Sequence, residues 1–291
     1  MSIMAISGRT RVCGVIGDPI AHTMSPVMHN AAFRKLGIDY VYVPFRVTRD
    51  GIGDAIAGMR ALNLAGLNVT IPHKISVTPF LDEIDPLARK IGAVNTVVND
   101  KGVIRGYNTD ASGFLQAMLD KGVRPDNKKV VVLGAGGASR AICYILAENG
   151  ASLSILNRAL EMEWAHNLAA EISGAFDIDT VALELNSDNL AKVMPGSDIL
   201  VNATSVGMSP DIRGTPVPAE LLESVPVVFD IVYNPVRTRL RSEAEQGGAL
   251  TISGLDMLVC QGALSFEKWT GQKAPLEIMK KEALKGLESE K

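Results

Sequence analysis

One segment near the middle of the chain constrains the fold more than any other. Residues 129–150, KVVVLGAGGASRAICYILAENG, run from a wholly apolar strand through a glycine-rich turn into an apolar helix, and a second apolar strand follows at Leu153–Leu156. A strand without polar alternation is typical of a parallel sheet that is buried on both faces. The segment therefore predicts a βαβ unit, in which a helix joins two parallel strands.

The turn in this segment has the spacing of a dinucleotide-binding loop. It reads G-x-G-x-x-S, with a serine where a third glycine or an alanine usually stands. Glycines allow a tight turn and bring backbone N–H groups close to a pyrophosphate at the helix N-terminus. We predict that the turn binds a dinucleotide through Gly134, Ala135, Gly136, Gly137, Ala138 and Ser139. The alternative is a strand-to-helix turn that holds no ligand.

The end of the second strand bears on which dinucleotide is bound. An NAD-preferring site usually places Asp or Glu about 20 residues beyond the glycines, where it holds the ribose hydroxyls. Here the strand ends in Asn157 and Arg158, and a guanidinium can pair with the 2′-phosphate of NADP. We therefore favour NADP, although Glu161 and Glu163 follow closely and would oppose a phosphate. A solvated arginine at the start of a helix is the alternative.

The length of 291 residues favours two domains over one. Before the glycine turn we predict strands at 11–17, 40–47 and 65–71, a hairpin at 93–108 that turns at 100–102, and helices at 27–36, 52–62 and 86–91, with Ser25 as the N-cap of the first. After the turn, further strands are predicted at 180–183, 199–203, 227–232 and 250–252. They alternate with helical segments, which indicates a doubly wound parallel sheet.

These patterns predict an α/β protein of two domains. An α/β substrate-binding domain would comprise residues 1–111 and 255–291, and a Rossmann-type dinucleotide domain would comprise residues 112–254. We expect a helix at 112–121 to link the two. Helices at 255–269 and 275–287 would pack back on the first domain.

Composition excludes several other classes of protein. The formal net charge of −3 gives no basic field for a phosphate backbone, so nucleic acid is not an expected partner. No apolar run approaches the roughly 20 residues that a membrane span needs. Residues 1–11 lack a long apolar stretch before a small-residue cleavage site. We therefore expect a globular cytoplasmic protein with no membrane partner.

The cysteines and histidines are not spaced as metal ligands. Cys13, Cys143 and Cys260 lie far apart and form no CxxC pair, so we expect them to be reduced residues of the core. Four histidines are each expected to lie at the surface or to cap a helix: His22, His29, His73 and His166. The sequence thus predicts no metal site.

Polar side chains mark the strand ends of the first region. They are Asn68, Thr70, Asn95, Thr96, Asn108, Thr109 and Asp110, with Lys74 just beyond a strand. Amides and hydroxyls at strand ends supply a polyhydroxylated ligand with donors and acceptors. Reduction of a ketone needs a proton donor, and Lys74 oriented by Asp110 is a candidate. Taken alone, Lys74 also fits a solvated loop lysine and Asp110 a helix cap.

From Gly14 to Trp269 the chain resembles the shikimate dehydrogenase family. Residues 17–26, GDPIAHTMSP, are similar to the family's opening loop, whose two hydroxyls bind the substrate carboxylate. The resemblance implies this role for Thr23 and Ser25. It also implies that Asn68, Thr70, Asn95, Lys74 and Asp110 bind the substrate, with Lys74 as the catalytic acid/base and Asp110 as its partner.

Three later segments, 202–204, 233–235 and 254–261, resemble parts of the family that surround the nicotinamide. The resemblance implies that Tyr233 and Gln261 bind substrate. It places Thr204, Val232 and Gly254 at the cofactor, where a close backbone approach requires a small residue at Gly254. A strand-to-helix turn is the alternative for this glycine.

Two positions depart from the family pattern. Thr23 stands where many members have serine, and it keeps the hydroxyl. The family's Asn-Arg-Thr-x-x-Arg at the NADP phosphate reads here Asn-Arg-Ala-Leu-Glu-Met, from Asn157 to Met162. Two phosphate contacts are thereby lost, so NAD remains an alternative cofactor.

The resemblance implies reversible NADPH-dependent reduction of 3-dehydroshikimate to shikimate in aromatic amino-acid (chorismate) biosynthesis, with the substrate held between the domains. One alternative is a quinate/shikimate dehydrogenase that uses NAD or NADP. Another is a non-catalytic sensor of a dinucleotide or of shikimate, against which the retained Lys74 and Asp110 count. A homodimer is left open.

Overall fold

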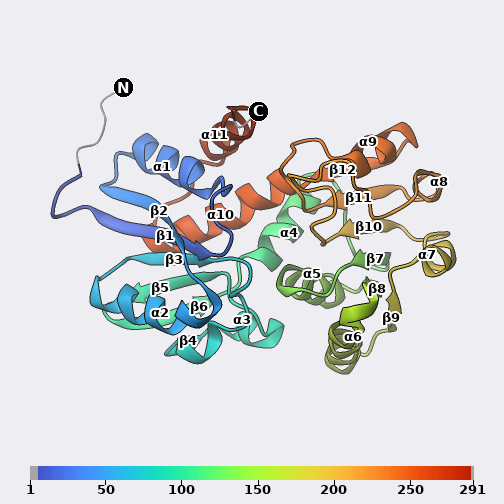
Figure 1. Cartoon of the computed structure of the whole chain (residues 1–291), viewed down its shortest axis with the longest axis horizontal. Helices are drawn as coiled ribbons and strands as arrows, with labels where there is room; N and C mark the ends of the chain where they lie inside the picture. The colour runs from blue at the N-terminus through green and yellow to red at the C-terminus, as the bar shows by residue number, and fades with distance from the viewer. Residues whose placement is uncertain (1–5, 290–291) are drawn as a thin grey trace. The chain divides into compact units, whose positions relative to one another are not determined.

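The structure is a computed structural model that describes residues 6–289 and divides the chain into two compact units. The first unit comprises the residues up to Gly113 together with those from Val259 onward, and the second unit is Phe114–Leu258. Figure 1 shows a sheet with helices around it in each unit. The α/β class expected from the sequence is confirmed. The boundaries expected at 111/112 and 254/255 lie slightly earlier in the chain than those observed.

The first unit is built on a mixed six-stranded sheet. Its strands are β1 (Arg11–Gly17), β2 (Tyr40–Arg46), β3 (Gly66–Val69), β4 (Glu83–Ile84), β5 (Thr96–Asp100) and β6 (Val103–Tyr107), in the order β2-β1-β3-β5-β6-β4. β1 is parallel to β2 and β3, whereas β5 is antiparallel to β3 and β6. Its helical elements are α1 (Ser25–Leu36), α2 (Ile52–Ala61), α3 (Pro86–Ile91), η1 (Arg49–Gly51), η2 (Thr78–Phe80) and α11 (Leu276–Ser289). α11 packs against α1, as expected for the C-terminal tail.

The β5–β6 hairpin follows from its turn residues. Lys101 and Gly102 both have positive φ, at 52° and 95°, which is the backbone that a tight two-residue hairpin requires. The side chain of Asn99 accepts a hydrogen bond from the Gly102 N–H at 2.8 Å. The turn therefore fixes the register that sets Thr96 opposite Tyr107, and next to this pair the Asn95 N–H donates to the Tyr107 carbonyl at 3.0 Å.

Two helices cross from one unit into the other along the chain. They are α4 (Asp110–Leu119) and α10 (Gly254–Thr270). In the first unit the end of α10 packs on the sheet, because the Trp269 Nε1–H donates to the Val97 carbonyl at 3.0 Å. Gly66 makes room for this indole, since a Cβ there would lie 2.0 Å from Trp269 Nε1.

The second unit is built on a six-stranded parallel sheet. Its strands are β7 (Lys129–Leu133), β8 (Ser152–Asn157), β9 (Thr180–Glu184), β10 (Ile199–Asn202), β11 (Val227–Asp230) and β12 (Leu250–Ser253), in the order β12-β11-β10-β7-β8-β9. Its helical elements are α5 (Gly137–Glu148), η3 (Ala159–Glu161), α6 (Met162–Phe176), α7 (Ser187–Val193), α8 (Ala219–Leu222) and α9 (Arg239–Gln246). The strand order reverses between β7 and β10, the place where doubly wound sheets bind ligands.

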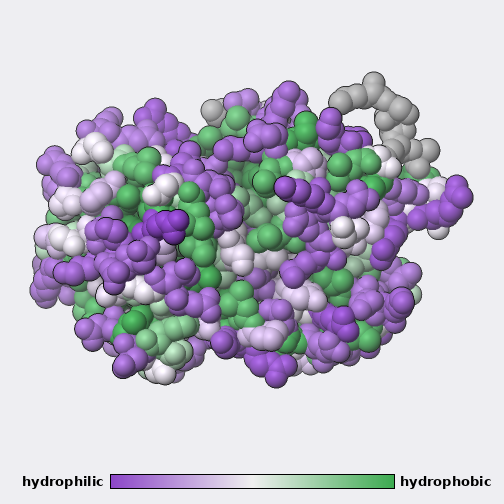
Figure 2. Space-filling model, turned by 180° about the vertical axis from the view of Figure 1, so that it is seen from behind, coloured by the Kyte–Doolittle hydropathy of each residue, from purple (hydrophilic) through white to green (hydrophobic). Residues whose placement is uncertain are grey.

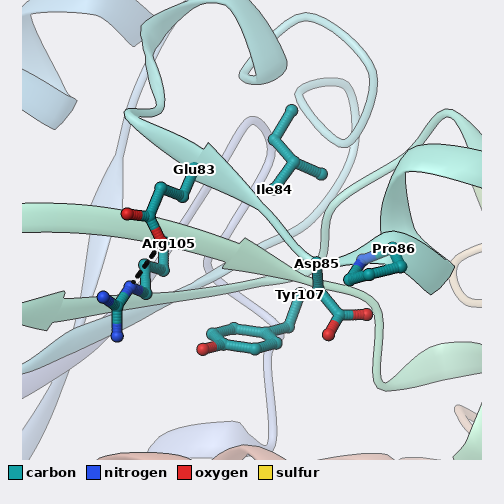
Figure 3. Close-up of a pocket in the computed structure, with 6 residues that line it drawn as sticks. All are labelled: Glu83, Ile84, Asp85, Pro86, Arg105 and Tyr107. Atoms are coloured by element: carbon teal, nitrogen blue, oxygen red, sulfur yellow. Dashed lines mark hydrogen bonds and ion pairs between the residues drawn. The ribbon is translucent and has the colours of Figure 1, made fainter.

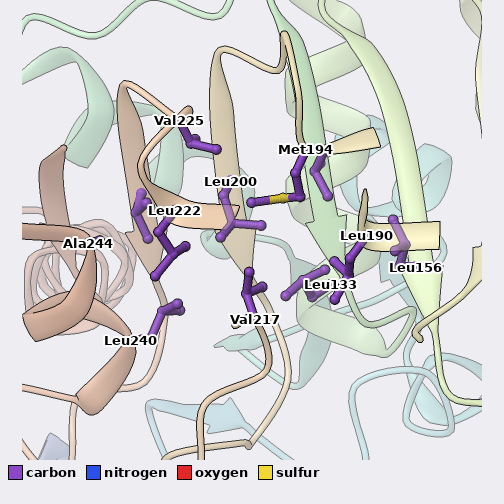
Figure 4. Close-up of a cluster of buried hydrophobic side chains, with 12 residues drawn as sticks. Leu133, Leu156, Leu190, Met194, Leu200, Val217, Leu222, Val225, Leu240 and Ala244 are labelled. Carbon is purple, nitrogen blue, oxygen red and sulfur yellow. The ribbon is translucent and has the colours of Figure 1, made fainter. Parts of the chain in front are cut away.

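A hydrophobic cluster lies between this sheet and the helices α7, α8 and α9 (Figure 4). Leu133, Leu156 and Leu200 come from the strands and are fully buried, and Leu222 and Leu240 meet them from α8 and α9. Burial of a leucine side chain is worth about 1.5–3 kcal/mol. The uniformly apolar strands noted in the sequence are therefore what holds this sheet together.

Several details differ from the sequence expectations. The residue that caps α1 is Met24 and not Ser25, because the helix begins at Ser25, two residues before the expected start at 27, and the Met24 side chain makes no capping hydrogen bond. β3 ends at Val69 and not at 71, since the next residues form the turn in which the His73 N–H donates to the Thr70 carbonyl. The two-residue strand β4 was not predicted.

The histidines and one cysteine also differ. His29 and His73 are fully buried and not at the surface, whereas His22 and His166 are exposed. His73 hydrogen-bonds the Val47 carbonyl at 2.7 Å, which accounts for its burial. Cys13 and Cys143 are free and buried, as expected. Cys260 is also free but is only partly buried.

Hydrophilic and hydrophobic side chains are interspersed on the face that Figure 2 shows, as is normal for a folded protein surface. Within residues 6–289, no helix is long and apolar enough to cross a membrane. The same residues contain no cluster of three His, Cys, Asp or Glu side chains that could hold a metal ion. The expected absence of a leader falls partly on residues 1–5, which lie outside the described residues.

Candidate active site

Lys74 and Asp110 form a largely buried ion pair in the first unit. The Nζ of Lys74 donates to Oδ2 of Asp110 at 2.6 Å, and the two side chains are only 15% and 7% exposed. The turn after β3 carries the lysine, and the Val94 N–H donates to its carbonyl at 2.7 Å. Asp110 is the first residue of α4. The structure thus joins two residues that the sequence separates by 36 positions.

Two amide side chains, Asn95 and Gln261, lie beside Thr109, which precedes Asp110 in the chain. Oδ1 of Asn95 accepts from the Thr109 N–H at 2.7 Å, and its Nδ2 donates to Oε1 of Gln261 at 3.3 Å. Gln261 reaches this position because α4 and α10 pack closely at Gly113, where a Cβ would lie 2.6 Å from the Gln261 nitrogen. Asn95 and Gln261 therefore meet beside the residue that precedes Asp110.

The opening loop lies along the end of β3. The Asp18 N–H donates to the Ile71 carbonyl at 3.0 Å, and a Cβ on Gly17 would lie 2.4 Å from Cγ2 of Thr70. The glycine is needed for this close approach. At the far end of the loop, Oγ1 of Thr23 accepts from the Ser25 N–H at 3.4 Å.

Asn68 connects this loop to the rest of the site. The Tyr42 hydroxyl donates to Oδ1 of Asn68 at 2.7 Å, and the Ser25 side chain lies beside it. Burial raises the pKa of Tyr42 well above its ordinary value, so this phenol stays a donor. The amide nitrogen of Asn68 donates to Oγ of Ser265 at 3.0 Å.

Sequence reasoning missed Ser265 and Tyr42. Oγ of Ser265 is fully buried and lies 2.7 Å from Oγ1 of Thr96 and 3.1 Å from Oγ1 of Thr109. It therefore joins Asn68 to the residue next to Asp110. The available signal was a serine four residues after Gln261 on the same face of a predicted helix.

In chemical terms, the first unit offers a lysine–carboxylate pair among several amides and hydroxyls. The pair can pass a proton to a developing alkoxide, with the carboxylate orienting the ammonium. The amides and hydroxyls can donate to and accept from ring hydroxyls. Of the nine predicted substrate residues, eight lie in the first unit, and Tyr233 lies in the second.

The glycine turn of the second unit follows β7 and opens α5. Gly134 has φ +101°, which a side chain would disfavour, and its Cβ would lie 3.0 Å from the Ala203 carbonyl oxygen. Gly136 is the N-cap of α5, and among the described residues no side chain caps this end and nothing lies within 4 Å of a Cβ placed there. Free N–H groups and open space at a helix N-terminus fit a pyrophosphate.

The serine at the third position of the motif has its own structural reason. The Ser139 hydroxyl is fully buried and donates to the Gly134 carbonyl at 2.6 Å. This hydrogen bond joins the first turn of α5 to the end of β7. The side chain at this position is small, so the backbone of the turn can approach a ligand.

Arg158 has a partner within the protein. Its side chain is 70% exposed, and its Nε donates to Oε2 of Glu161 at 2.6 Å, while Nη2 donates to Oε1 of the same carboxylate. The side-chain hydrogen bond of Arg158 lowers the pKa of Glu161. Asn157 fixes the turn, since its Nδ2 donates to the Glu161 carbonyl at 2.8 Å.

Asp230 is a further residue that sequence reasoning missed. It is fully buried at the end of β11, where Oδ1 accepts from Asn202 Nδ2 at 2.9 Å and from the Val232 N–H at 3.1 Å. Oδ1 of Asn202 in turn accepts from the Thr204 hydroxyl at 2.7 Å. Burial raises the pKa of Asp230. The carboxylate thus positions Thr204 and Val232, and an acid at the end of an apolar strand was the signal for it.

Gly254 begins α10 directly after β12. A Cβ there would lie 2.1 Å from the Ile231 carbonyl oxygen, so the protein's own backbone already requires glycine.

One cavity of the first unit, about 250 Å³ in volume, lies at the edge of the sheet (Figure 3). It is lined by Glu83, Ile84, Asp85, Pro86, Arg105 and Tyr107. Arg105 is paired there with Glu83 at 2.8 Å, and Asp85 caps α3. None of the predicted site residues lines this cavity.

Comparisons with known proteins give a consistent result. The profile of the shikimate dehydrogenase substrate binding domain matches residues 15–97, and that of the shikimate 5′-dehydrogenase C-terminal domain matches residues 254–284. The shikimate dehydrogenase (NADP(+)) of Methanosarcina mazei is 48% identical over 282 residues, which cover 96% of this chain and 99% of that protein.

Solved structures are equally similar. A shikimate dehydrogenase in complex with NADP+ superposes with a TM-score of 0.90 at 42% identity, covering 97% of each chain. The shikimate 5-dehydrogenase of Listeria monocytogenes, solved in complex with shikimate and NAD, gives a TM-score of 0.88 at 40% identity, covering 97% of this chain and 98% of that one.

Proposed function

Because the chain belongs to the shikimate dehydrogenase family, we propose that it catalyses the reversible NADPH-dependent reduction of 3-dehydroshikimate to shikimate, a step in chorismate and aromatic amino-acid biosynthesis. The chain is an NADP-dependent oxidoreductase. The observation that carries the proposal is the Lys74–Asp110 pair, 2.6 Å apart and largely buried among amides and hydroxyls. A protein that only binds its ligands has no need of such a pair.

In this proposal, Lys74 is the acid/base. NADPH, when bound, supplies the hydride that adds to the ring carbonyl carbon. Nζ of Lys74 donates a proton to the carbonyl oxygen as that oxygen gains negative charge, and it takes the proton back when shikimate is oxidised. Asp110 keeps the ammonium oriented through the 2.6 Å hydrogen bond. The 15% exposure of the lysine lets water return its proton.

The remaining substrate contacts follow the chemistry of each side chain. We assign the substrate carboxylate to the hydroxyls of Thr23 and Ser25, at the end of the opening loop. The ring hydroxyls are assigned to side chains with both donors and acceptors: Asn68, Thr70, Asn95, Asp110, Tyr233 and Gln261. Hydrogen bonds with Ser265 and Tyr42 hold the Asn68 side chain in place.

The dinucleotide is assigned to the second unit. Residues Gly134–Ser139 would hold the pyrophosphate through the N–H groups that follow Gly134, since the Gly134 N–H itself donates to the Leu156 carbonyl at 2.7 Å. Asn157 and Arg158 would hold the adenosine end. Thr204, Val232 and Gly254 would lie at the nicotinamide. The open space at Gly136 and the exposed Arg158 support this assignment.

A second candidate is a quinate/shikimate dehydrogenase that uses NAD as well as NADP. The engagement of Arg158 by Glu161 favours it, because the guanidinium is shared with a protein carboxylate. We also propose that the protein forms a homodimer and that it is located in the cytoplasm. Light scattering after size-exclusion chromatography tests the homodimer.

The direct test follows nicotinamide absorbance while shikimate, and separately quinate, is offered with NADP and then with NAD. We expect turnover of shikimate that is faster with NADP. Comparable rates with NAD or quinate would select the second candidate. Tight binding of NADP and shikimate without turnover would contradict both candidate functions and would indicate a non-catalytic sensor.

A further inference from the structure

The ion pair between Arg158 and Glu161 lies where the 2′-phosphate of a dinucleotide would bind in the proposed site. We propose that Glu161 is a specificity-determining residue, which acts through Arg158 and lowers the preference of the site for a dinucleotide that carries a 2′-phosphate. The inference rests on the proposed function, since it concerns the same dinucleotide site.

The backbone places the Glu161 carboxylate on Arg158. Arg158 is the extended residue that precedes η3, and Glu161 is the last residue of this single turn. The Glu161 N–H donates to the Arg158 carbonyl at 2.9 Å, and the Glu161 carbonyl accepts from Asn157 at 2.8 Å. With both of its backbone polar groups bonded, Glu161 is held in place, and its side chain is only 23% exposed.

The carboxylate uses two donors of the guanidinium. Nε and Nη2 of Arg158 donate to the two oxygens of Glu161, so the contact is a fork of parallel hydrogen bonds. Phosphate groups engage arginine through the same planar fork. A 2′-phosphate must therefore either displace Glu161 from these donors or share the guanidinium with it.

Charge adds to this competition. A carboxylate beside Arg158 repels a phosphate bound to the same guanidinium, whereas an unphosphorylated ribose meets no such repulsion. At separations of about 6 Å in water and at low ionic strength, repulsion between a carboxylate and a singly or doubly charged phosphate changes affinity about three- to tenfold. The sign is fixed by geometry: removal of the Glu161 charge favours the phosphorylated ligand.

The test is calorimetric titration of the full chain with 2′,5′-ADP, which carries the 2′-phosphate, and with 5′-ADP, which lacks it. At low ionic strength, we expect the ratio of the two affinities in Glu161→Gln to shift about three- to tenfold toward 2′,5′-ADP. Glu161→Asp keeps the charge and should restore most of the wild-type ratio. In an Arg158→Gln background, Glu161→Gln should favour 2′,5′-ADP less than it does in the wild-type background, because the competition for the guanidinium is gone and only the direct repulsion remains.

Glu243→Gln is the matched control, because Glu243 pairs with Arg239 on α9 of the same unit and is similarly exposed. It should leave the affinity ratio unchanged. Wild-type protein that binds both ligands, with a ratio unaffected by Glu161→Gln, would overturn this inference alone. Wild-type protein that binds neither ligand would overturn the proposed dinucleotide site and the inference with it.

Discussion

At the scale of single residues, His29 shows how burial changes the pKa of a titratable side chain. The ring is fully buried and stacks on Tyr42 at 4.4 Å between centroids, with Trp269 at 5.2 Å. Within the described residues, neither ring nitrogen has a hydrogen-bond partner. Desolvation by burial lowers the pKa of His29 to about 3. The folded protein therefore holds this histidine neutral.

This burial predicts a loss of stability in acid. Between about pH 6.5 and the folded pKa of about 3, the unfolded chain binds a proton that the folded chain does not, so the free energy of unfolding falls as pH falls. At pH 5 the loss from His29 is about 2 kcal/mol relative to neutral pH. His29→Phe keeps the aromatic packing and removes the titration. Urea unfolding at pH 7 and pH 5 should show a flatter dependence for this variant.

His22→Phe is the control, since His22 is exposed, and it should keep the wild-type pH dependence. An unchanged difference between pH 7 and pH 5 in His29→Phe would contradict the burial argument. The burial of His29 could not be predicted from the sequence, because it depends on Tyr42 and Trp269, which are distant in the chain and pack against the ring only in the fold.

At the scale of elements, the contact of α10 with the sheet of the first unit depends on Gly66. A Cβ on β3 at this position would lie 2.0 Å from Trp269 Nε1, whose hydrogen bond to Val97 joins α10 to β5. Gly66→Ala must displace the indole. Overpacking and the loss of this bond should lower the free energy of unfolding by about 2–4 kcal/mol, as measured by urea denaturation.

Gly58→Ala provides the comparison within the same unit. Gly58 lies inside α2, and within the described residues nothing lies within 4 Å of a Cβ placed there. Alanine is the better helix former, so this variant should be stabilised by about 0.5–1 kcal/mol. Equal effects of the two substitutions would refute the role given to Gly66.

Most elements could be predicted from the sequence, for reasons that these residues make clear. Gly37 and Gly102 adopt the positive φ that their turns require, and the apolar run 130–133 can only be a buried strand. The end of β3 and the cap of α1 were missed although local hydrogen bonds set them, from the His73 N–H to the Thr70 carbonyl and from the Met28 N–H to the Met24 carbonyl. Sequence patterns place such boundaries only to within a residue or two.

At the scale of the whole molecule, the two units divide the chemistry between them. The first unit holds Lys74, Asp110 and the amides around them, and the second holds the glycine turn and Arg158. The sequence alone suggested each residue type, and the family resemblance assigned the roles. That Lys74 and Asp110 meet, and that Ser265 joins Asn68 to Thr109, follows only from the fold, because these contacts join segments far apart in the chain.

The most direct test of the account is the turnover number for shikimate oxidation by Lys74→Ala, measured beside its affinity for 2′,5′-ADP. Loss of the acid/base should lower kcat about 10²- to 10⁴-fold while the dinucleotide affinity stays near that of wild type. Lys128→Ala, which breaks an exposed ion pair with Asp198, should leave both unchanged. A turnover number for Lys74→Ala within a few-fold of wild type would contradict the proposed mechanism.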